Sequence, residues 1–350
     1  MRLDLHRHLE GSHSPRALLE VARDFGIRAR PFFDEARQCF RSADELSAEI
    51  TMGAPSDDAS QFYRCIVLAR AAYASVEAVG ALARLAFREA ADETDGCEMR
   101  VSLFSMARTV IENRGLAWRD VPPARFADDW ARPLLAAVLG ARDRVVAETG
   151  KPILVRLGLS RTFESEPHYR ALATMAAEHA PALVGLDVLG IVAGADKEPM
   201  PAALVDILDG LRAHLPDLTV HAGEFEGHAS VDRTLALSPR AIGHGVRALE
   251  SPATLERLAR EGVTLEVCPS SNRLLIPTAL AALERARGAT PLAALQRASV
   301  HCVLGSDDPT PMRTSYRRER ELAAELGVDL ARLDADTRRR WGQLTGGAAG

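Results

Sequence analysis

Short apolar runs rich in β-branched residues alternate along the chain with longer Ala-, Leu- and Arg-rich stretches of helical period. The short runs are typical of buried strands, and the longer stretches are typical of amphipathic helices. Strands and helices that alternate in this way predict βαβ units and a parallel sheet. We identify eight candidate strands, which span residues 2–8, 97–104, 152–159, 183–188, 218–221, 241–244, 263–268 and 300–305. Eight such units predict a (β/α)8 barrel of the α/β class, a TIM barrel.

The connection between the first two strands is much longer than the others. It contains four stretches of helical period, at residues 15–25, 43–50, 57–72 and 76–92. Pro31 and the segment 53–55 interrupt them. A loop that follows a barrel strand lies at the C-terminal face, where active sites are built. We therefore expect residues 12–95 to form a helical cap insertion over the pocket, within one barrel domain that comprises residues 1–350.

Composition narrows the class of protein. The 350 residues are 47% hydrophobic, which suits one large barrel core. A formal net charge of -5 argues against a nucleic-acid surface. The two dense basic runs, residues 317–320 and 338–340, lie among acidic residues in helical sequence, so we interpret them as solvated helix faces.

Neither the apolar runs nor the cysteines suggest export. No apolar run is long enough to span a membrane, and no signal peptide is visible before the first strand. The five cysteines are irregularly spaced, which disfavours a disulfide framework. We therefore expect a cytoplasmic protein with no membrane partner. The pattern does not indicate an oligomeric state.

Three strands end in residues that suit a metal site. His6 and His8 are two positions apart on a strand, so their side chains point to the same face. His221 ends the fifth strand and Asp307 follows the eighth, and all parallel strands of a barrel end at one rim. Three imidazoles and a carboxylate suit zinc better than magnesium or calcium, although iron and manganese remain alternatives. Zinc would lower the pKa of a bound water to about 7 and so supply a nucleophile.

Three further residues at the same rim are candidates for catalysis. Glu224 follows His221 closely and could act as a general acid if burial raises its pKa. His244 lies between two glycines and could orient the attacking water. Asp308 could accept a proton or hydrogen-bond a ring nitrogen of the substrate. The ordinary alternatives are a surface carboxylate, a core histidine and a turn residue.

Five segments resemble, in order, the motifs of the adenosine/adenine deaminase family of the amidohydrolase superfamily. They are His-Arg-His-Leu-Glu-Gly at 6–11, His-Ala-Gly-Glu at 221–224, Ile-Gly-His-Gly at 242–245, Cys-Pro-Ser-Ser-Asn at 268–272 and Ser-Asp-Asp-Pro at 306–309. The resemblance runs from residue 3 to about residue 325.

The resemblance implies a role for each of these residues. One zinc ion per chain would be bound by His6, His8, His221 and Asp307. Glu224 would protonate the purine ring at N1, while His244 and Asp308 would position the attacking hydroxide. Asp308 would also contact N7, and the backbone of Gly190 would meet N3.

Two departures from the family pattern point to an altered substrate. Adenosine-specific members carry Asp near the sugar where this chain has Glu10, whereas adenine and aminofutalosine-type deaminases often have Glu. The family's Gly-Asp-Glu after the fourth strand is here Gly-Ile-Val at 190–192, so we expect one polar contact to be missing. Glu98 and Arg100 match a family pair that we interpret as structural.

The remaining polar candidates receive structural interpretations. We expect His13 to cap the helix that begins near Ser14, His168 to be solvated, and Arg161 to form a surface ion pair. Cys268 lies near the pocket but has no base beside it in sequence, so we do not expect a nucleophile there.

These observations predict a metal-dependent hydrolase. The expected reaction is zinc-dependent hydrolytic deamination of an adenine-type purine, namely adenosine, adenine or a substituted adenosine, with release of ammonia and the 6-oxo purine. One alternative is another amidohydrolase-type hydrolase, because a fold does not determine its chemistry. The other is a catalytically silent binding protein.

Overall fold

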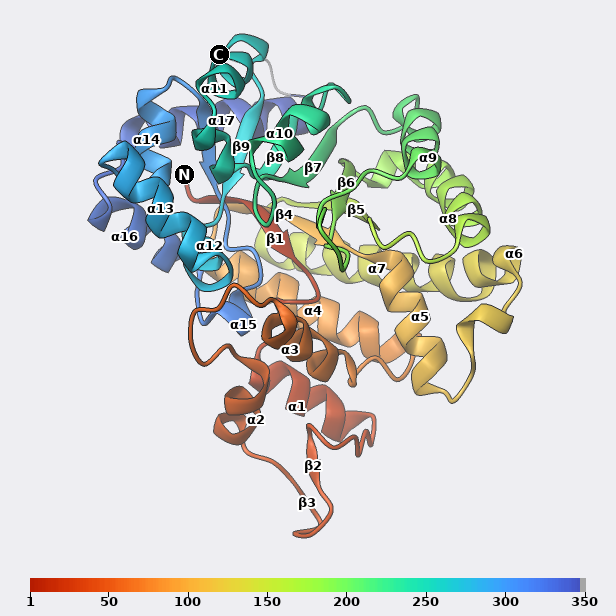
Figure 1. Cartoon of the computed structure of the whole chain (residues 1–350). Coiled ribbons are helices and arrows are strands. Elements are labelled where there is room, and N and C mark those ends of the chain that lie inside the picture. Colours follow the sequence, from red (N-terminus) through yellow and green to blue (C-terminus); the bar gives the residue numbers. More distant parts are fainter. Residues whose placement is uncertain (347–350) are drawn as a thin grey trace.

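The computed structural model describes residues 1–346 and contains the predicted barrel (Figure 1). One eight-stranded sheet comprises β1 (Leu3–His8), β4 (Gly96–Val101), β5 (Ile153–Ser160), β6 (Gly185–Leu189), β7 (Leu218–Ala222), β8 (Ala241–His244), β9 (Thr264–Val267) and β10 (His301–Leu304). Neighbouring strands are parallel throughout. The sheet closes where the His8 N–H donates to the Asp307 carbonyl and the Asp307 N–H donates to the His6 carbonyl, each at 2.8 Å. The (β/α)8 TIM barrel is therefore confirmed.

The second predicted strand is too long by three residues. The strand β4 ends at Val101, and α5 (Leu103–Asn113) already contains Leu103 and Phe104. The Ser102 N–H donates to Glu10 Oε1 at 2.9 Å instead of continuing the sheet. A continuous apolar run does not distinguish the end of a buried strand from the start of a buried helix, which explains the error.

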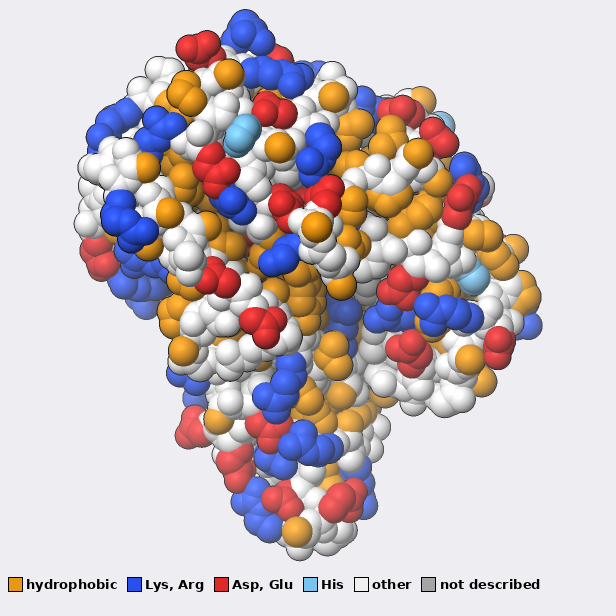
Figure 2. All heavy atoms as spheres, viewed as in Figure 1, with side chains coloured by type: hydrophobic (Ala, Val, Ile, Leu, Met, Phe, Trp, Pro, Cys, Tyr) orange, Lys and Arg blue, Asp and Glu red, His pale blue; other side chains and the backbone are white. Residues whose placement is uncertain are grey.

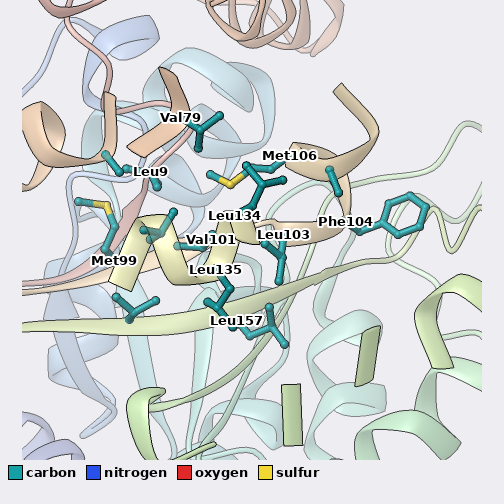
Figure 3. Packing of buried hydrophobic residues seen from close by; sticks show 14 of the residues in the cluster. Leu9, Val79, Met99, Val101, Leu103, Phe104, Met106, Leu134, Leu135 and Leu157 are labelled. Carbon is teal, nitrogen blue, oxygen red and sulfur yellow. The ribbon is translucent and has the colours of Figure 1, made fainter. Parts of the chain in front are cut away.

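Helices cover the outside of the barrel. They are α4 (Val76–Glu93), α5, α6 (Pro123–Arg125), α7 (Arg132–Thr149), α8 (Glu166–Glu178), α9 (Ala202–Arg212), α10 (His228–Leu235), α11 (Pro252–Glu261), α12 (Pro269–Leu275), α13 (Pro277–Arg287), α14 (Pro291–Arg297), α15 (Pro309–Met312), α16 (Tyr316–Glu325) and α17 (Leu330–Thr345). Figure 3 shows Leu134 and Leu135 of α7 close to Leu103 and Leu157, and all four are fully or almost fully buried. Each such side chain contributes about 1.5–3 kcal/mol through burial.

The segment between β1 and β4 contains more than helices. It comprises α1 (Pro15–Asp24), a small hairpin of β2 (Phe33–Asp34) and β3 (Cys39–Phe40), α2 (Ala43–Ile50), α3 (Ser60–Arg70) and α4. Figure 1 shows α1, α2, α3 and the hairpin extending below the barrel, whereas α4 packs along α7. Ser14 accepts the Ala17 N–H at 3.2 Å and so caps α1.

The surface agrees in part with the charge pattern. Figure 2 shows acidic and basic side chains interspersed over the visible face. Arg318 pairs with Glu325 at 2.9 Å on an exposed face of α16, as expected. Arg340 was expected to be solvated, and this prediction is wrong, because its guanidinium is buried and bonds to Asp217 at 2.7 Å. Within residues 1–346, no helix combines the length and apolarity needed to cross a bilayer.

Candidate active site

The four predicted metal ligands converge at the C-terminal end of the barrel. His8 Nε2 lies 3.3 Å from His6 Nε2 and 3.2 Å from His221 Nε2. Asp307 Oδ1 lies 3.6 Å from His6 Nε2 and 3.3 Å from His8 Nε2. A cation between these ring nitrogens and the carboxylate oxygen would be bound by all four side chains. Ligand atoms about 2.0–2.1 Å from a tetrahedral zinc ion would lie about 3.3 Å apart, so this donor set fits zinc.

Buried carboxylates determine which nitrogens are free to bind metal. His6 Nδ1 lies 3.0 Å from Glu266 Oε2, and His221 Nδ1 lies 3.1 Å from Asp187 Oδ1. A carboxylate accepts a hydrogen bond from a ring nitrogen that carries a proton, so each of these histidines is protonated on Nδ1. The Nε2 lone pair of both histidines is then available to a metal. Arg100 joins the two carboxylates, because its Nε lies 2.9 Å from Asp187 and its Nη2 contacts Glu266.

His244 lies beside these ligands but carries its proton on the other nitrogen. Its ligand atoms lie within 4.8 Å of those of His6, His221 and Asp307. The amide Nδ2 of Asn272 lies 3.2 Å from His244 Nδ1 and donates to it, which leaves the proton on Nε2. That Nε2 faces Glu224 Oε2 at 3.4 Å. His244 is therefore arranged as a hydrogen-bond donor.

The backbone at these strand ends is held in an unusual conformation. His244 and Asp307 have φ angles of 60° and 59°, in the left-handed region that non-glycine residues rarely adopt. Such strain persists where the surrounding structure enforces it, commonly at functional sites. Gly305 allows β10 to approach β1, because a Cβ there would lie 2.2 Å from His6 Cβ.

Glu224 is buried beside the metal ligands. Burial, followed by the negative charges of Asp307 and Glu198, raises the pKa of Glu224 well above its ordinary value. Burial and the adjacent Asp307 likewise raise the pKa of Asp308. The raised pKa favours the protonated form of Glu224, which is the form that a general acid needs.

A cavity of about 250 Å³ connects these groups to the surface. All the predicted site residues that could contact a substrate line it: His8, Glu10, Gly190, His221, Glu224, His244, Asp307 and Asp308. Helix α3 of the predicted cap contributes a wall of Phe62, Tyr63, Ile66, Val67 and Arg70. Glu10 Oε2 is buried without a hydrogen-bond partner in the described chain, so it is free to contact a ligand.

Three predictions about other polar residues are wrong. Arg161 is not a surface ion pair, because it is buried and donates to the carbonyls of Gly190 and His221. His168 is not solvated, because its Nε2 lies 2.9 Å from the Val121 carbonyl. His13 does not cap α1, because its ring is buried with Nε2 2.7 Å from the Tyr73 hydroxyl.

A match to a known family assigns the chain as a whole. Residues 2–337 match the family model described as adenosine deaminase. The chain belongs to the adenosine deaminase family. The chain is therefore a metal-dependent amidohydrolase that acts on an adenine-type substrate.

Relatives within the adenosine deaminase family differ in their named substrates. An adenine deaminase of Chelativorans sp. (strain BNC1) is 30% identical over 96% of this chain and 91% of its own length. An aminodeoxyfutalosine deaminase of Acidothermus cellulolyticus is 29% identical over 94% of this chain and 83% of its own length. Among solved structures, an amidohydrolase from Burkholderia ambifaria with bound zinc has a TM-score of 0.72 at 17% identity, over 100% of this chain and 85% of that one.

Several polar residues that support the family's motifs were missed as functional residues in the sequence. Asp187 and Glu266 stand inside apolar strand sequences, Leu-Asp-Val and Leu-Glu-Val. A carboxylate within a buried strand must be paired, so this pattern was an available signal. Glu198 gave no such signal, since it lies in the polar loop between β6 and α9.

Proposed function

We propose that this member of the adenosine deaminase family uses one zinc ion per chain to hydrolyse the exocyclic amino group of an adenine-type purine. The products are ammonia and the 6-oxo purine. The observation that carries the proposal is the convergence of three imidazole nitrogens and Asp307 beside the buried carboxyl of Glu224. The family relationship supports the same reaction class.

The proposed zinc ligands are His6, His8, His221 and Asp307. Their mutual spacing and the free Nε2 atoms support this set, and a structurally similar amidohydrolase contains zinc. When bound, zinc lowers the pKa of a water molecule and thereby makes a nucleophile available at neutral pH.

The chain's own residues would donate the proton to the substrate and hydrogen-bond its purine ring. Glu224 would give a proton to ring nitrogen N1, which gains electron density when water adds at C6. The Nε2–H of His244 would orient the attacking oxygen. The carboxyl of Asp308, whose pKa is raised by burial and by Asp307, would hydrogen-bond N7, and the Gly190 N–H would donate to N3.

The part of the cavity beyond the metal ligands suits a substituent on the purine. We propose that residues 1–350 form one barrel domain and that the segment 12–95 caps it, with α3 supplying the outer wall of the pocket. Arg70, at the end of α3, has a buried Nε without a partner in the described chain. Together with Glu10 it would bind a polar group on the substrate, which favours a substituted adenosine over unmodified adenosine.

Substitution of Glu224 by Gln tests the proposed chemistry. The amide keeps the shape of the acid but has no proton to give, so deamination should fall by about 10²–10⁴-fold while zinc content stays at one per chain. Glu261→Gln, on the exposed face of α11, is the control and should retain full activity. A Glu224→Gln protein that deaminates at the wild-type rate would exclude Glu224 as the acid.

A substrate panel tests the reaction and its specificity together. Ammonia release would be measured with adenine, adenosine, 5′-substituted adenosines and AMP. Failure of the zinc-loaded wild type on every aminopurine, with turnover of an amide or lactone, would favour another amidohydrolase chemistry. Protein that binds no zinc and turns over nothing would favour the silent binding protein.

A further inference from the structure

The loop that carries Glu224 is held by a second buried carboxylate. Glu198, which is 2% exposed, accepts the backbone N–H groups of three successive loop residues. Its Oε2 accepts from Gly223 at 2.8 Å, and its Oε1 accepts from Glu224 at 3.1 Å and Phe225 at 2.8 Å. The Ser230 hydroxyl on α10 donates to Oε2 at 2.5 Å. One side chain thus satisfies three backbone donors and joins them to a helix.

This loop cannot satisfy its donors in another way without moving. Gly223 has a φ of 65°, so the chain turns as β7 ends, and the N–H groups of residues 223–225 all donate to Glu198. A Cβ on Gly223 would lie 2.5 Å from Val231 Cγ2, which shows how closely the loop packs on α10. Buried backbone donors without acceptors are costly, so losing the carboxylate would favour a different loop conformation.

Glu198 lies a few residues beyond the point at which the sequence departs from the family pattern. The family's Gly-Asp-Glu is Gly-Ile-Val here, at residues 190–192. In the loop that follows, the Val192 N–H donates to the Lys197 carbonyl at 3.0 Å and brings the next residue, Glu198, back to the barrel. Asp196 Oδ1 accepts the Glu198 N–H at 3.1 Å and fixes the approach of the carboxylate.

We propose that Glu198 is the positioning residue for Glu224, which it aims at the substrate by fixing the backbone of residues 223–225. This inference rests on the proposed role of Glu224 as the acid. Glu198 also lines the cavity, but it acts through the loop backbone. A general acid displaced by about 1 Å can lose about 10²-fold in rate, so the loop need move only slightly.

Two substitutions of Glu198 remove these hydrogen bonds completely or in part. Glu198→Ala removes all four and should lower kcat by about 10²-fold, with zinc content and KM close to wild type. Glu198→Gln keeps one acceptor oxygen and places an amide donor against a backbone donor, so it should retain more activity, with a loss of about 10-fold. The kcat of each variant is compared with its folded fraction measured by circular dichroism.

Asp336→Asn is the matched control for loss of a buried carboxylate. Asp336 accepts the Cys302 N–H at 3.0 Å and lies 2.7 Å from His301 Nδ1, at the opposite end of the barrel from the site. Asp336→Asn should lower the free energy of unfolding and leave kcat unchanged. An equal fall in kcat for Asp336→Asn and Glu198→Gln would overturn the proposal, because the effect would then be one of general stability.

Amide hydrogen exchange tests the contact without depending on activity. In Glu198→Gln and in Ser230→Ala, the peptide covering residues 221–227 should exchange faster, while peptides from β1 and β10 stay protected. Unchanged exchange at 221–227 would overturn the proposed role of Glu198. If instead the loop loosens but the wild type deaminates no purine, the proposed function fails and the positioning contact stands.

Discussion

Removing Arg100 should weaken metal binding as well as stability. Arg100 is fully buried and joins Glu266 and Asp187, the two carboxylates that orient His6 and His221. Arg100→Met leaves those carboxylates without their cation. Breaking a buried ion pair by removing one partner costs about 3–5 kcal/mol. Loss of a group that orients metal ligands lowers metal affinity by about 10–100-fold.

Arg156→Met separates the two effects. Arg156 is as deeply buried as Arg100 and pairs with Glu98 at 2.7 Å and Asp217 at 2.8 Å, without touching the carboxylates that orient the metal histidines. It should lose a similar free energy of unfolding but keep wild-type zinc affinity.

The assay pairs urea denaturation of the metal-free proteins with zinc competition against a chromophoric chelator. The expected result is a stability loss in both variants and an affinity loss in Arg100→Met alone. Equal zinc affinity in Arg100→Met and wild type would refute the reasoning that Arg100 acts through Glu266 and Asp187. Equal loss in both variants would show that zinc affinity follows overall stability.

Three further predictions follow from other parts of the structure. Burial opposes ionisation of Asp217, but the charges of Arg156 and Arg340 hold its pKa below the ordinary value. The stability that the Asp217 carboxylate contributes is therefore complete above about pH 4 and is lost as the pH falls. Asp217→Asn should weaken the fall in the free energy of unfolding at acid pH, as measured by urea denaturation. Gly305→Ala should abolish soluble, active protein, because the new Cβ would clash with His6. In Gly140→Ala, on α7, the new Cβ would meet no atom within 4 Å, so the free energy of unfolding measured by urea denaturation should rise by about 0.5–1 kcal/mol. Removal of zinc with a chelator should abolish deamination and lower the melting temperature, and both should recover on adding zinc, because a ligand of the folded state stabilises it.

The local pattern of the sequence determined the architecture and the main candidates. Alternation of strand and helix gave the eight-stranded barrel, because each unit must bury one apolar face. The two-residue period of β1 placed His6 and His8 on one face, and parallel strands brought His221 and Asp307 to the same rim. Glu224 was identified for the same reason, as a polar residue just after a barrel strand.

Contacts between distant segments decided what these side chains can do. The sequence does not show that Asp187 and Glu266 free the Nε2 atoms of two histidines, or that Asn272 leaves a proton on His244. Nor does it show that Glu198 reaches back to the Glu224 loop. The two-residue period along a strand specifies which face of the sheet a side chain lies on. Protonation and hydrogen bonding depend instead on which atoms from other strands and loops lie within about 3 Å of that side chain. Only the folded barrel determines those neighbouring atoms.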